Sequence, residues 1–66
     1  MSKTGQIIVG PKLPVLTCRV IDYSAGGACL DIGPSVVPDR LEFLYGGVRK
    51  KSRVVWRRGI RIGLAF

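Results

Sequence analysis

Apolar and polar positions alternate two residues apart through most of this chain. A two-residue period places successive side chains on opposite faces of a strand, whereas no window keeps the i, i+3, i+4, i+7 spacing of an amphipathic helix over three turns. Six segments show the alternation and are predicted to be strands: 6–9, 15–21, 28–32, 41–45, 48–57 and 60–66. The pattern therefore predicts an all-β fold with little or no helix.

Glycine and proline mark where these strands end. Gly10-Pro11 stops the first strand, because proline has no amide hydrogen for the ladder. Gly46-Gly47 supplies the positive φ angles of a two-residue hairpin turn, and Arg58-Gly59 predicts a second tight turn. Short strands joined by such turns bury their apolar faces best by closing the sheet on itself. We expect residues 1–66 to form one domain, a six-stranded antiparallel β barrel.

The connection Asp22-Tyr23-Ser24-Ala25-Gly26-Gly27, between the second and third predicted strands, is longer and more polar than a hairpin requires. One interpretation is a recognition loop in which Tyr23 stacks on a base. The other is a structural turn: Asp22 and Ser24 bond nearby amides, the glycines supply positive φ, and the Tyr23 ring caps the core.

The motif Asp-x-Ser-x-x-Gly, formed by Asp22, Ser24 and Gly27, is followed by Val54-Val55-Trp56 and by Ile62-Gly63-Leu64-Ala65-Phe66. Together these landmarks resemble the PilZ domain family. The resemblance implies a six-stranded antiparallel barrel that, in ligand-binding members, is a receptor for the bacterial second messenger cyclic di-GMP. Carried over by position, it implies that Asp22 and Ser24 make polar contacts to the ligand and that Gly27 allows a close approach.

The second half of the family's site is an Arg-x-x-x-Arg segment upstream of the first strand, and this chain lacks it. Lys3 is the basic residue nearest to that place, and an ammonium lacks the planar fork of a guanidinium. Two explanations stay open: a degenerate family member, or a longer natural N-terminus. We expect weak or absent binding of cyclic di-GMP by this chain.

The formal net charge of +7 favours an anionic partner. Seven of the eleven basic residues fall between positions 49 and 61, with no acid among them: Arg49, Lys50, Lys51, Arg53, Arg57, Arg58 and Arg61. This basic hairpin could receive phosphates or an acidic protein, or it could be the solvated face of a hairpin. Alternation predicts that Arg53 and Arg57 share a face and that Trp56, in phase with Val54, belongs to the core.

Three functions follow from these residues. The first is a cyclic di-GMP receptor or a degenerate relative, and the second is a ligand-independent adaptor that docks a protein partner on the basic hairpin. The third, a nucleic-acid-binding barrel, is disfavoured by the scarcity of exposed aromatic residues. We expect no enzyme activity and no cofactor, because histidine is absent and the four carboxylates are dispersed.

Cys18 and Cys29 are the two cysteines of the chain. Alternation places Cys18 on the face of Leu16 and Val20, and Cys29 opposite the face of Leu30, so a disulfide between them is not expected. Two cysteines without histidine also leave no ligand set for zinc. These features, together with the absence of an apolar run long enough to span a membrane, predict a reduced, cytoplasmic protein without a membrane span.

Overall fold

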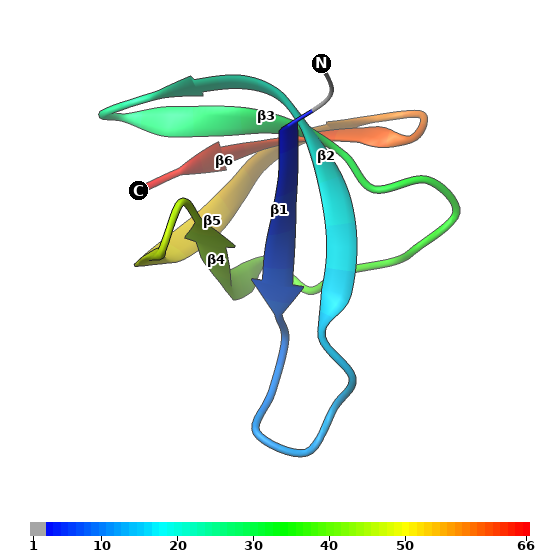
Figure 1. The fold of residues 1–66 in the computed structure, drawn as a ribbon. Helices are drawn as coiled ribbons and strands as arrows, with labels where there is room; N and C mark the ends of the chain where they lie inside the picture. Colours follow the sequence, from blue (N-terminus) through cyan, green and yellow to red (C-terminus); the bar gives the residue numbers. More distant parts are fainter. Residues whose placement is uncertain (1–2) are drawn as a thin grey trace.

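The computed structural model describes residues 3–66, and these form six antiparallel strands in one closed barrel (Figure 1). The strands are β1 (Lys3–Ile8), β2 (Leu16–Ser24), β3 (Gly27–Asp31), β4 (Arg40–Tyr45), β5 (Val48–Arg58) and β6 (Arg61–Ala65). Around the barrel they follow the order β1-β2-β3-β6-β5-β4, and β4 pairs back on β1. The prediction of a helix-free six-stranded antiparallel barrel is confirmed. Within residues 3–66 no helix is long and apolar enough to cross a membrane.

The core fills the inside of the barrel with one side chain or more from every strand. Its fully buried members are Ile7, Leu30, Phe43 and Ile62, which come from four different strands. Phe43 is accommodated because β1 has Gly5 opposite its ring, where a Cβ atom would lie 2.6 Å from Phe43 Cε1. Burying an apolar side chain of this size contributes about 1.5–3 kcal/mol, so each of these four residues stabilises the barrel.

The turn between β4 and β5 has the backbone that its two glycines predict. Gly46 has φ of 60° and Gly47 has φ of 79°, as a two-residue type I′ turn requires. This turn sets the register of the hairpin, in which Tyr45 lies opposite Val48 and Arg40 lies opposite Arg53. Gly59, with φ of 59°, makes the corresponding tight turn between β5 and β6.

The connection after Ile21 is shorter than the sequence predicts. β2 continues through Asp22, Tyr23 and Ser24, and Ser24 pairs with Gly27, so the turn consists of Ala25 and Gly26. A bulge between Val20 and Asp22 absorbs one extra residue, which lets the strand bend and go on. The prediction of a six-residue turn was wrong, and so was the expectation that Gly26 and Gly27 supply positive φ.

A second bulge lies in β5 between Val54 and Trp56, and it overturns two predictions about faces. Trp56 pairs with Gly63 on the outer face, where the indole lies against this glycine and stays 43% exposed. Trp56 is therefore not part of the core. Beyond the bulge Arg57 pairs with the buried Ile62, while Arg53 before it pairs with Ala65, so the two arginines lie on opposite faces.

Candidate functional site

A cluster of aromatic rings closes one end of the barrel. The ring of Tyr23 lies 5.1 Å from that of Tyr45, 5.6 Å from Phe66 and 6.3 Å from Phe43, measured between centroids. The bulge in β2 brings Tyr23 to this position, because it places Tyr23 opposite Ala28, which packs against the core. Tyr23 thus caps the core, and 37% of its surface stays accessible. Tyr23 is therefore partly accessible to a ligand at this end of the barrel.

Beside this cap, a pocket of about 450 Å³ opens at the rim of the barrel. Its lining comes from the beginning of β1, the bulged part of β2 and the end of β4: Lys3, Arg19, Val20, Ile21, Asp22, Tyr23 and Tyr45. We call it the rim pocket. The structure therefore brings together three residues that the sequence singled out, namely Lys3, Asp22 and Tyr23.

The carboxylate of Asp22 is the acidic group of the rim pocket. Its Oδ1 accepts a hydrogen bond of 2.9 Å from the amide of Tyr23. The carboxylate forms no ion pair within residues 3–66. Arg19, by contrast, already binds Asp31 at 3.1 Å. The pocket thus combines a carboxylate with spare acceptor capacity, a lysine and two tyrosine side chains.

Ser24 and Gly27, the other two motif residues, lie outside the lining of the rim pocket. The hydroxyl of Ser24 donates a 3.3 Å hydrogen bond to the carbonyl of Gly27 and so holds the tight β2–β3 turn. A Cβ atom on Gly27 would overlap the carbonyl oxygen of Leu64 in β6. The structure therefore supplies a reason within the fold for glycine at position 27.

Sequence reasoning missed Arg19 and Tyr45 as members of the rim pocket. Arg19 could have been found, since it faces outward three positions before Asp22 on a strand that the alternation predicts. Tyr45 could not, because its approach to Tyr23 depends on barrel closure between strands far apart in sequence. Within residues 3–66 no three His, Cys, Asp or Glu side chains gather where they could hold a metal ion.

The basic hairpin does not form one continuous surface. Arg49 binds Glu42 at 3.5 Å and Arg57 binds Asp39 at 3.1 Å, while the ammonium of Lys50 lies 5.8 Å from the ring centre of Phe66. The remaining members fall into two places. Lys51 and Arg53 face outward on β5 beside β4, and Arg58 lies opposite Arg61 next to the β5–β6 turn.

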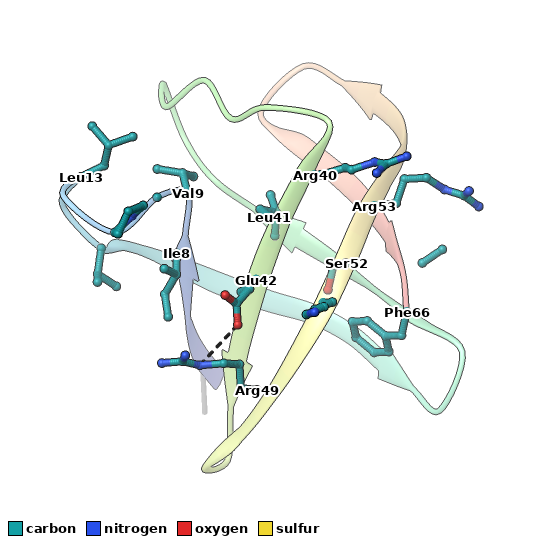
Figure 2. A pocket seen from close by; sticks show the side chains of 15 residues that line it. Ile8, Val9, Leu13, Arg40, Leu41, Glu42, Arg49, Ser52, Arg53 and Phe66 are labelled. Carbon is teal, nitrogen blue, oxygen red and sulfur yellow. Dashed lines mark ion pairs between the residues drawn. The ribbon is translucent and has the colours of Figure 1, made fainter.

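A larger groove of about 990 Å³ lies along β4 and β5, lined by outward side chains of both strands and also by the buried Leu41 and Ser52 (Figure 2). One side is formed by apolar residues of the end of β1 and the loop that follows it, including Val9, Leu13 and Val15. Basic side chains from β4 and β5 also line it: Arg40, Arg49, Lys51 and Arg53. Arg40 and Arg53 lie across the groove from Leu13, whereas Arg49 lies on the β1 side near Ile8 (Figure 2). We call this the β4–β5 groove. Arg40 was not among the predicted residues, although the register of the Gly46-Gly47 turn places it opposite Arg53.

Comparison of the chain with models of protein families, with curated proteins and with solved structures finds no match.

Proposed function

We propose that this protein is a small PilZ-like binding module whose rim pocket takes cyclic di-GMP with low affinity. The observation that supports this proposal most is the convergence of Lys3, Asp22 and Tyr23 on one pocket at the end of the barrel. The resemblance of the Asp22-x-Ser24-x-x-Gly27 motif to the PilZ family supplies the identity of the ligand. A pocket of about 450 Å³ is within the range of small-molecule sites, which run from about 300 to 1,000 Å³.

The chemistry of the pocket suits one guanine and one phosphate. A carboxylate accepts hydrogen bonds from the N1 and N2 donors of a guanine edge, which is the role we assign to Asp22. Tyr23 offers part of its ring for stacking on the base, and the ammonium of Lys3 attracts a phosphate. Ser24 is exposed at the adjoining turn, where its hydroxyl could turn toward a ligand.

Low affinity follows from the basic groups of the pocket. Lys3, the basic residue nearest to the place of the family's arginine segment, presents a point charge, so it fixes neither the plane nor the orientation of a phosphate. Arg19 has the right group, but its guanidinium is already bound to Asp31. Binding of a phosphate by Arg19 would have to compete with that ion pair.

The test is an NMR titration of the folded chain with cyclic di-GMP. We expect the amide signals of Asp22 to Gly27, together with that of Arg19, to shift progressively without saturating below high micromolar ligand. Asp22→Asn should remove the shifts, because an amide cannot accept both guanine donors. Asp39→Asn is the matched control, since this acid pairs with Arg57 and does not line the rim pocket. Unmoved signals at millimolar ligand, also with the longest natural form of the chain, would refute the receptor function.

A second candidate is an adaptor that docks an acidic protein partner through the basic hairpin. Five of its seven basic side chains, namely Lys50, Lys51, Arg53, Arg58 and Arg61, form no ion pair within residues 3–66. Unpaired cations on a surface favour association with an anionic partner. Partner capture that Asp22→Ala leaves unchanged, and that charge reversal of the hairpin abolishes, would favour the adaptor over the receptor.

A further inference from the structure

Arg40 and Arg53 are the least expected pair of neighbours on the outside of the barrel. They are directly opposed partners on the adjacent strands β4 and β5, and both are exposed. Like charges at directly opposed positions destabilise a sheet. Within residues 3–66 neither guanidinium has an acidic partner, so their repulsion is not relieved inside the fold. An anion placed between them would relieve it.

The surroundings of this pair say what kind of anion fits. Across the β4–β5 groove from the two arginines lies Leu13, which is 58% exposed (Figure 2). Val15, which is 50% exposed, also lines the groove. Side chains this apolar and this exposed, facing a groove, are suited to contact an apolar group of a bound molecule. The groove thus combines an apolar wall with a cationic wall.

Glu42 lies between the two walls and determines where along the groove positive charge remains. It forms an ion pair with Arg49, which neutralises the part of the groove nearest the β4–β5 turn (Figure 2). The positive charge that remains is concentrated at Arg40 and Arg53, with Lys51 beside Glu42 on β5. The anionic groups of a ligand are therefore directed toward the Arg40–Arg53 end.

We propose that the β4–β5 groove binds an acidic peptide segment of a protein partner, with carboxylates on Arg40 and Arg53 and an apolar side chain against Leu13 and Val15. The proposal rests on the adaptor function and narrows it to one groove and one ligand chemistry. A peptide fits better than a lipid with one carboxylate, because two acidic side chains of a peptide can pair with Arg40 and Arg53 separately while an apolar side chain reaches the opposite wall. A nucleic acid would make no use of the apolar wall.

The test measures fluorescence anisotropy of a labelled eight-residue peptide of alternating glutamate and leucine, titrated with the whole chain at low salt. Arg40→Glu and Arg53→Glu should each weaken binding by about fivefold to tenfold, since each replaces attraction with repulsion. Arg58→Glu changes the net charge equally but lies outside the groove, so it should change affinity by less than about twofold. Circular dichroism confirms that each variant is folded.

The apolar wall is tested with a matched pair of variants. Leu13→Ser should weaken binding of the Glu-Leu peptide by about threefold to tenfold. Val36→Ser, on a loop outside the groove, should leave its affinity unchanged. A peptide of alternating glutamate and serine should bind more weakly than the Glu-Leu peptide and be insensitive to Leu13→Ser. A peptide of alternating glutamine and leucine should not bind.

Each failure points to a different error. If Arg58→Glu weakens binding of the Glu-Leu peptide as much as Arg40→Glu does, the peptide does not bind in the β4–β5 groove, while the adaptor function survives. If no acidic peptide binds, both the groove proposal and the adaptor function are wrong. Binding of dodecanoate or of a 12-nucleotide single strand in place of the peptide, lost in Arg40→Glu, would overturn the proposal in favour of a lipid or nucleic-acid site.

Discussion

The hairpins β2–β3 and β5–β6 carry the same irregularity with different results. Each has one bulge in its first strand, between Val20 and Asp22 in β2 and between Val54 and Trp56 in β5. In β2 the bulge turns an aromatic side chain inward, because Tyr23 joins the rings at the end of the barrel. In β5 it leaves an aromatic side chain outside, because Trp56 lies against Gly63 of the neighbouring strand.

The difference follows from where each aromatic residue stands relative to its bulge: Trp56 is the first paired residue after the β5 bulge, whereas Tyr23 is the second after the β2 bulge. Beyond the β2 bulge Asp22 faces Cys29, which leaves the carboxylate at the rim pocket. Beyond the β5 bulge Trp56 faces a glycine, and the indole occupies the space that a side chain would take. One bulge therefore builds a candidate binding site, and the other covers a gap in the outer surface.

The largest loss of stability is expected on substitution of a glycine in the second strand of each hairpin, Gly27 in β3 and Gly63 in β6. Gly27→Ala places a methyl group against the backbone carbonyl of Leu64, which cannot move without disturbing β6, so we expect a loss of about 3 kcal/mol. Gly63→Ala meets the half-exposed indole of Trp56, which can swing away, so about 1–2 kcal/mol should be lost. Urea unfolding followed by circular dichroism measures both.

Gly26→Ala is the control for these two substitutions, because nothing lies within 4 Å of its Cβ position and its φ is not positive. Its stability should stay within about 0.5 kcal/mol of the parent chain. In addition, Trp56→Ala should remove most of the cost of Gly63→Ala in a double-mutant cycle. Purely additive losses would contradict the packing of Trp56 on Gly63.

The aromatic side chains give the second prediction. Tyr23→Ala removes contacts with three rings and should cost about 2–3 kcal/mol, whereas Trp56→Ala, although it deletes a larger group, should cost about 1 kcal/mol. Tyr23→Phe keeps the ring and should be nearly neutral. Acrylamide quenching of the Trp56 fluorescence, efficient in the native state, would confirm the outer position. A larger loss for Trp56→Ala would return this residue to the core.

The sequence was sufficient for the strands and the barrel because those depend on local patterns. Alternation located all six strands, and Gly46-Gly47 determined both a turn and the register of β4 with β5. The bulges were not predictable, because Ile21 and Val55 are ordinary strand residues whose extra place in the ladder depends on twist and closure of the barrel. Every error about faces, at Trp56 and Arg57, lies beyond a bulge.

For the candidate site too, single residues could be predicted from the sequence, whereas their meeting in space could not. Asp22 and Tyr23 were singled out by a motif and by composition, and Lys3 by its distance from the first strand. Their meeting in one pocket depends on the bulge and on closure, as does the participation of Tyr45. Arg40 was within reach of sequence reasoning, because a two-residue turn at 46–47 places position 40 opposite position 53.

The cysteines give the smallest prediction, and they test the inward position of Cys18 in β2 and the outward position of Cys29 in β3. Cys18 points inward before the bulge, and burial raises the pKa of its thiol from 9.0 to about 11 despite a hydrogen bond with the Gly5 backbone. The unfolded chain releases this proton near pH 9, whereas the native chain holds it until about pH 11. Stability from Cys18 is therefore complete below pH 9 and is lost as the pH rises through 11.

By pH 10 the expected loss from Cys18 is about 1.4 kcal/mol. Urea unfolding at pH 8 and pH 10 measures this loss of stability. The Cys18→Ala variant separates it from the titration of lysine and tyrosine, because between the two pH values the variant should lose about 1.4 kcal/mol less than the parent chain. Cys29, half-buried on the outer face opposite Asp22, should react with a thiol reagent in the native state at pH 8 while Cys18 does not. Equal reactivity would place both thiols on one face of the sheet, which would contradict the pairing of Cys18 with Gly5 and of Cys29 with Asp22.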